Sequence, residues 1–140
     1  MSLTKIPHYS TCFVCGDKND IGLHLEFWYD ESKKEIISHF KPETWWDGYK
    51  GIVHGGLQAA ILDEGMGWTI YPLTGDYYLT MELTVRYRFP LESGKEYEFR
   101  GWIIKQFKDY FFTKGEIVDT QGKVYAKASG KYKRMAPTEG

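Results

Sequence analysis

Residues 51–71 read GIVHGGLQAAILDEGMGWTIY, and this stretch decides the fold. A glycine-rich turn precedes apolar residues that recur at the spacing of one helical face. These residues are Leu57, Ala60, Ile61, Trp68 and Tyr71. Pro72 follows at once, and because proline cannot continue a helix, the pattern predicts a long apolar helix that ends there.

Both the start and the centre of this helix carry groups that are candidates for a functional site. The glycines leave backbone N–H groups open at the end of the helix that favours negative charge. Asp63 and Glu64 are unusual in such an apolar helix, because a carboxylate in a core needs a partner or a function.

The remainder of the chain predicts strands, because apolar and polar residues alternate along it. Consecutive strands with short polar connections indicate an antiparallel meander. The order is β-β-α-β-β-β-β, an α+β fold in which a curved antiparallel sheet wraps around one central helix. The expected strands are 22–29, 35–40, 77–89, 97–105, 110–118 and 123–132.

The bulk properties restrict the function classes. The chain has 140 residues, the size of one domain, which we expect to span 1–140 with an N-terminal extension at 1–21 and a frayed tail at 136–140. A net charge of −1 argues against a nucleic-acid partner. The sequence shows neither a signal peptide nor an apolar stretch long enough to span a bilayer, so we expect a soluble cytoplasmic protein without a membrane partner.

Cys12 and Cys15 form a C-x-x-C pair followed by Gly16. One interpretation is half of a zinc site with His8 or His24 as further ligands, although no second C-x-x-C is present to complete it. The favoured interpretation is a tight turn with two small, partly buried thiols. A redox function is not favoured, because no βαβ pattern surrounds the pair. We therefore expect no metal.

His54-Gly55-Gly56 at the helix start, with Asp63 nine residues after the histidine, resembles a known family. Together with the element order, these residues are similar to the hotdog-fold acyl-CoA thioesterases of the phenylacetate-pathway and 4-hydroxybenzoyl-CoA thioesterase group. The segment from Leu79 to Pro90 and the C-x-x-C-Gly opening also resemble members of that group. The resemblance implies a homodimer, possibly a tetramer, that hydrolyses acyl-CoA without a metal or organic cofactor.

The spacing of Gly56 and Asp63 then predicts where the site is formed. Backbone N–H groups can polarise a thioester carbonyl, and a carboxylate can attack it or activate water. Gly56 and Asp63 lie seven residues apart, about 10 Å along a helix, whereas a reacting carbon must lie about 3 Å from both groups. Two antiparallel helices across a dimer axis would bring Gly56 of one chain to Asp63 of the other.

Further residues are assigned to this site as candidates. Asp63 is the expected nucleophile or general base, and Glu64 is either a second acid or a buried partner of an arginine. His54 either shapes the helix start and contacts the substrate carbonyl or only caps the helix. The resemblance places the Thr80 hydroxyl near the attacking water. The expected substrate-binding residues are Gly55, Trp46, Tyr49, Met81, Arg86 and Arg88.

Two other functions on the same fold remain as alternatives. A hydroxyacyl-CoA dehydratase or hydratase requires a catalytic histidine paired with an acid. A non-catalytic acyl-CoA-binding module requires only the pocket. Neither the acyl group nor the choice between direct attack by Asp63 and activation of water is predicted.

Overall fold

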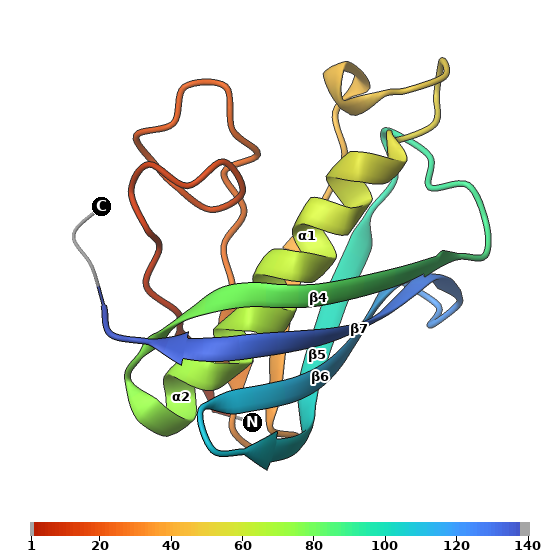
Figure 1. The fold of residues 1–140 in the computed structure, drawn as a ribbon. Helices are drawn as coiled ribbons and strands as arrows, with labels where there is room; N and C mark the ends of the chain where they lie inside the picture. Colours follow the sequence, from red (N-terminus) through yellow and green to blue (C-terminus); the bar gives the residue numbers. More distant parts are fainter. Residues whose placement is uncertain (1, 138–140) are drawn as a thin grey trace.

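The computed structural model describes residues 2–137, and these form one antiparallel sheet curved around a helix (Figure 1). The strands lie in the order β1-β2-β3-β5-β6-β7-β4. This confirms the hotdog-like α+β fold. The strands are β1 (Leu3–Lys5), β2 (Trp28–Asp30), β3 (Glu35–Phe40), β4 (Tyr77–Tyr87), β5 (Tyr97–Phe107), β6 (Tyr110–Asp119) and β7 (Val124–Met135).

Helix α1 (Gly55–Gly67) lies in the concave face of the sheet, where it contacts β3, β4, β5, β6 and β7. Ile61, Leu62 and Met66 are fully buried there. Gly65 allows close approach to the sheet, because a Cβ at this position would lie 2.1 Å from the ring of Phe99 on β5. The absence of a side chain at Gly65 therefore lets the last turn of α1 pack closely on the sheet.

The helical path extends past the predicted end at Tyr71. A 3-10 turn (Trp68–Ile70) follows α1, and a short helix α2 (Tyr71–Thr74) follows the turn. Pro72 lies in the first turn of α2 rather than after a helix end. Proline is tolerated there because the first N–H groups of a helix have no partner within the helix. Gly75, at φ 73°, ends the segment instead.

The N-terminal segment differs from the prediction in its pairing. Residues 22–29 alternate as expected, with Leu23, Leu25 and Phe27 buried. However, only the end of this segment is a strand, β2. Before it, the amides of Leu23 and Leu25 donate to the carbonyls of Phe13 and Val14, so the chain pairs with the C-x-x-C turn. Strand β1, which the sequence analysis did not predict, pairs with β2.

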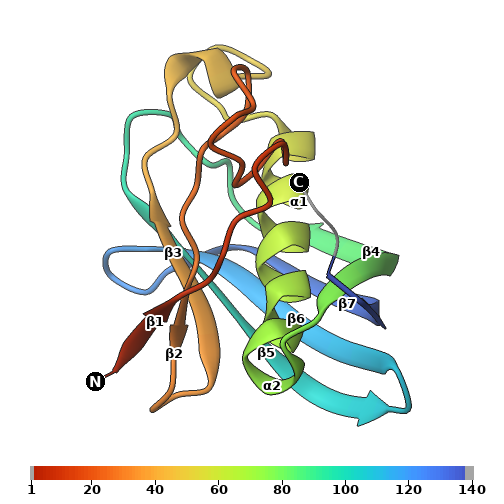
Figure 2. The same ribbon diagram turned by 90° about the vertical axis from the view of Figure 1, so that its left-hand side faces the viewer.

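Strand β4 forms one edge of the sheet and, among the strands of residues 2–137, pairs with β7 alone. It is unusually exposed for a long strand, and its apolar residues Leu79, Met81 and Tyr87 each retain about half of their accessible surface. Figure 2, turned by 90°, shows β4 at the side of α1 opposite to β1, β2 and β3. An exposed apolar edge strand is a ready template for pairing with another chain.

The expected tail at 136–140 falls partly outside the described residues, at 138–140. Within the described part of the chain, no helix has the length and apolar character needed to cross a membrane.

Candidate active site

Asp63 is half-buried in the middle of α1 and is held by two hydroxyl groups from the sheet. Its Oδ1 accepts hydrogen bonds of 2.9 Å from Thr80 Oγ1 and 2.9 Å from the Tyr132 hydroxyl. Both bonds fall on the same carboxylate oxygen. Within residues 2–137, Oδ2 accepts no hydrogen bond, so the second oxygen is available for a reacting water or carbonyl carbon.

An irregularity in β4 aims Thr80 at this carboxylate. Simple alternation groups Thr80 with Glu82, Thr84 and Arg86 on one face of the strand. The register between β4 and β7 shifts between Thr80 and Glu82, so alternation does not run through this point. Thr80 consequently contacts α1 on the concave face. A bulge that re-aims a side chain is common beside active sites.

The surroundings of Asp63 act on its charge in opposite directions. Burial raises the pKa of Asp63, and the hydrogen bonds from Thr80 and Tyr132 oppose that rise by favouring the ionised form. Burial also raises the pKa of Tyr132, which therefore remains a hydrogen-bond donor toward Asp63. Tyr132 is not predictable from the sequence, because nothing there distinguishes it from other strand tyrosines.

The start of α1 offers fewer free amides than the motif suggests. His54 is the N-cap, and its Nδ1 accepts a hydrogen bond of 2.9 Å from the Gly56 amide. The amide of Gly55 has no acceptor among the described residues. The Tyr87 hydroxyl on β4 donates to the Gly55 carbonyl at 2.7 Å and ties the first helical turn to the sheet edge.

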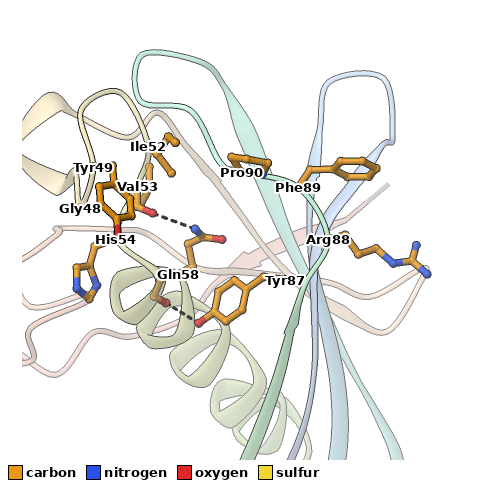
Figure 3. Close-up of a pocket in the computed structure, with 11 residues that line it drawn as sticks. Gly48, Tyr49, Ile52, Val53, His54, Gln58, Tyr87, Arg88, Phe89 and Pro90 are labelled. Carbon is orange, nitrogen blue, oxygen red and sulfur yellow. Dashed lines mark hydrogen bonds between the residues drawn. The ribbon is translucent and has the colours of Figure 1, made fainter.

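A cavity of about 620 Å³ opens beside this helix start. Figure 3 shows Tyr49, Val53, His54 and Tyr87 around it, with Gln58 reaching from the first turn of the helix. Gln58 Nε2 donates to the Val53 carbonyl at 3.1 Å, whereas the buried Oε1 has no partner in the described structure. An unpaired acceptor at the wall of a cavity is a candidate for a contact with a ligand. Gln58 was not among the predicted site residues.

The predicted substrate-binding residues separate into two groups. Gly55, Tyr49 and Arg88 line the cavity. Trp46 does not, because it is buried and its ring stacks on Phe40 at 6.3 Å between centroids. Met81 and Arg86 are exposed on β4 and lie outside this cavity. Asp63 also lies outside this cavity. Within one protomer, the cavity at the helix start and the Asp63 carboxylate are therefore separate.

Glu64 points away from Asp63 into a polar cluster of its own. Its oxygens accept hydrogen bonds of 2.7 Å from Trp68 Nε1, 2.7 Å from the Tyr78 hydroxyl and 2.7 Å from Cys15 Sγ, and Cys12 Sγ lies 3.5 Å away. The arginine partner, one of the two alternatives for Glu64, is therefore replaced by two thiols, an indole and a phenol. Through Glu64, the residue that follows Asp63, this cluster holds the C-x-x-C turn against α1.

With the fold and these residues in place, the chain can be compared with known proteins. Residues 50–126, more than half of the chain, match the thioesterase superfamily. The chain belongs to this superfamily. The matched region includes α1 and the candidate residues Asp63 and Thr80.

Curated relatives of this superfamily member include the acyl-coenzyme A thioesterase THEM5. The mouse and human proteins are each 28% identical over 116 residues, which cover 81% of this chain and 46% of theirs. The Xenopus laevis acyl-coenzyme A thioesterase THEM4 is 28% identical over 78 residues, 56% of this chain and 35% of its own length. The chain thus spans about half or less of the length of these relatives.

Solved structures of proteins described as thioesterases have the same fold. The thioesterase superfamily protein RHA08564 superposes with a TM-score of 0.80 at 22% identity, covering 89% of this chain and 60% of its own. The PaaI protein of the E. coli phenylacetic acid degradation operon gives 0.69 at 19% identity, covering 76% and 77%. A hypothetical thioesterase from Streptococcus pneumoniae TIGR4, crystallised with coenzyme A, gives 0.69 at 17% identity, covering 75% and 84%.

Proposed function

We propose that this superfamily member hydrolyses an acyl-CoA thioester to the free acid and coenzyme A. The observation that carries the proposal is the Asp63 carboxylate, whose Oδ1 is fixed by Thr80 and Tyr132 while Oδ2 is unbonded in the described structure. A carboxylate held in this way can attack the carbonyl carbon or take a proton from an attacking water. Relatives named as acyl-CoA thioesterases support the substrate class.

The helix start supplies the second half of the proposed site. The free Gly55 amide lies where the helix dipole favours developing negative charge on the thioester oxygen. The Gly56 amide becomes a second donor when the carbonyl displaces the His54 ring from its capping position. The acyl-CoA enters through the cavity of Tyr49, Gln58 and Tyr87.

The two halves meet only if two protomers associate, so the proposal includes a homodimer. Gly56 and Asp63 are both in α1, and seven residues of helix separate them by about 10 Å. The exposed edge strand β4 offers a surface on which two copies pair antiparallel. Because α1 lies against β4 in each chain, this pairing would make the two α1 helices antiparallel. The helix start of one chain would then lie beside Asp63 of the other.

The arrangement of His54 does not favour the dehydratase alternative. Its Nδ1 is occupied by the Gly56 amide, and within residues 2–137 no carboxylate contacts its ring. A histidine used as an acid–base catalyst needs a partner that orients it. The non-catalytic binding module differs from the thioesterase only in turnover, so a rate measurement separates them.

The test is release of free coenzyme A thiol from short, long and aromatic acyl-CoAs. We expect turnover by the wild type and a loss of at least about a hundredfold in Asp63→Asn, the usual contribution of a positioned acid–base group. Glu64→Gln, measured in parallel, tests the second acid. Saturable binding without turnover of any acyl-CoA would instead identify a binding module, and equal rates of Asp63→Asn and wild type would remove Asp63 from the mechanism.

A further inference from the structure

Cys12, Cys15 and Glu64 form a cluster that the proposed hydrolysis does not use. Their ligand atoms, two sulfurs and a carboxylate oxygen, all lie within 4.8 Å of one another. Cys15 and Glu64 are buried and Cys12 is partly buried. The two cysteines come from the N-terminal turn and the carboxylate from α1, so the cluster joins segments that are far apart in the sequence.

The charges of this cluster are not balanced by the protein. The hydrogen-bond partners of Glu64 are two thiols, an indole and a phenol, and no lysine, arginine or histidine forms an ion pair with it in residues 2–137. Asp63, the next residue, adds a second carboxylate nearby. Buried negative charge normally requires a positive partner or a bound cation.

The turn itself has a compact geometry that brings the two sulfurs to the same side. The Gly16 amide donates to the Cys12 carbonyl at 2.9 Å. A Cβ at Gly16 would lie 2.4 Å from the Ser10 carbonyl oxygen, so only glycine fits after the second cysteine. The folded chain thus presents both thiols together toward the carboxylate of α1.

We propose that Cys12, Cys15 and Glu64 bind one divalent cation of the zinc class. Two thiolates and one carboxylate are a ligand set suited to Zn²⁺, whereas Ca²⁺ and Mg²⁺ prefer oxygen ligands alone. Ligands around zinc lie about 2.0–2.3 Å from the ion, so the present cluster needs only small movements. On binding, each thiol loses its proton to solvent, and the S–H···O contacts are replaced by metal–sulfur and metal–oxygen bonds.

The site has three protein ligands and one open position for water. The histidines that the sequence suggested do not complete it, because His8 Nε2 lies 3.3 Å from Asp17 Oδ1 and His24 Nε2 lies 2.6 Å from the Asn19 carbonyl. The proposal differs from the sequence-based expectation of no metal. Glu64 lies 52 residues from Cys12 and 49 residues from Cys15, so the C-x-x-C spacing does not identify it as the third ligand. The cation would fasten the N-terminal turn to α1 beside Asp63.

The experiment uses the full chain, reduced and stripped with a chelator, and titrated with Co²⁺ as a spectroscopic probe. We expect one Co²⁺ per chain, ligand-field bands of tetrahedral coordination and a sulfur-to-cobalt charge-transfer band. Zn²⁺ should displace Co²⁺ and abolish these bands. The variants Cys12→Ser and Cys15→Ser should lose the charge-transfer band, and Glu64→Gln should bind more weakly. The control His8→Ala, whose side chain pairs with Asp17, should bind as the wild type does.

A second measurement does not depend on the folding of any variant. In the reduced wild type, Zn²⁺ should protect Cys12, the more exposed of the two thiols, from alkylation by iodoacetamide, as read by the mass of the intact protein, and a chelator should restore the reaction. Absence of the cobalt bands together with equal alkylation with and without Zn²⁺ would overturn the proposal. Because neither readout measures turnover, the result stands apart from that of the thioesterase assay.

Discussion

Tyr132, on β7, donates a 2.9 Å hydrogen bond to Asp63 in the middle of α1, across 69 residues of sequence. The same hydroxyl lies 3.2 Å from the Asp63 backbone carbonyl, so it contacts the residue at two points. The sheet therefore fixes both the side chain and the helical position of the proposed catalytic carboxylate. This contact explains how a carboxylate can be kept in one orientation inside an apolar helix.

Removing this hydroxyl should impair catalysis more than folding. A hydrogen bond to a charged group contributes about 1.5–3 kcal/mol, so we expect Tyr132→Phe to reduce kcat/KM by roughly ten- to a hundredfold. The measurement is thiol release under steady-state conditions. Tyr125→Phe is the matched control, because its hydroxyl bonds to Asp119 instead. Equal losses in both variants would point to a general effect on the sheet.

Filling the space at Gly65 should destabilise the protein. The added Cβ of Gly65→Ala would lie 2.1 Å from the Phe99 ring, and either the ring or α1 must move. Overpacking of this kind costs about 1–3 kcal/mol, which urea unfolding can measure. Ala59→Gly, at a partly buried position of the same helix, provides a comparison for ordinary helix propensity. A Gly65→Ala protein as stable as the wild type would mean that α1 does not pack closely against Phe99.

A charged side chain introduced on the edge strand β4 should dissociate the proposed dimer. Met81 retains 52% of its accessible surface on β4, and burial of an arginine there between two chains would be unfavourable. We expect Met81→Arg to be monomeric by light scattering and to lose activity. Leu73→Arg is the control, since Leu73 is 61% exposed on α2 and lines a pocket with Ile36 and Ile103 rather than with residues of β4. A dimeric and active Met81→Arg protein would argue against pairing through β4.

Acid should weaken the turn between β2 and β3. The Ser32 hydroxyl and the amides of Ser32 and Lys33 donate to Asp30, and these bonds lower the pKa of that carboxyl. A lowered folded-state pKa gives stability that is present above the ordinary value of about 3.9 and is lost as the pH falls through the folded-state pKa.

The difference in unfolding free energy between wild type and Asp30→Asn should therefore be largest near neutral pH and shrink in acid. Urea unfolding across this pH range measures it, with the exposed neighbour Glu31→Gln as control. A difference that does not change with pH would show that the Asp30 bonds do not depend on its charge.

The sequence predicted most of the fold because alternation and helical spacing are local. The strands from Tyr77 onward and the buried face of Leu23, Leu25 and Phe27 followed directly from that pattern. Alternation cannot tell which segment an extended chain pairs with. It predicts one strand over residues 22–29, whereas Leu23 and Leu25 bond to the C-x-x-C turn and only the end of the segment is a strand.

The candidate site was predictable only where a motif marks it. Asp63 and Thr80 were found, and the structure brings them to 2.9 Å. Tyr132 and Gln58 were not, because their roles come from contacts between distant segments. The hydrogen bond from the Gly56 amide to His54 depends on a side-chain rotamer, which cannot be predicted from the spacing of residues in the sequence. Likewise, the convergence of Glu64 with Cys12 and Cys15 requires the three-dimensional fold.

The central claim, that the helix start of one chain serves Asp63 of another, is tested by subunit complementation. Gly56→Leu places a side chain over the exposed helix start, and Asp63→Asn removes the acid. Each variant alone should be inactive while remaining dimeric by light scattering. Co-expressed or unfolded and refolded together, the two should recover thiol release at about a quarter of the wild-type rate, because random pairing forms one intact site in half of the dimers. Recovery at that level is the predicted result. No recovery from a mixture shown to contain heterodimers would contradict a site shared between chains.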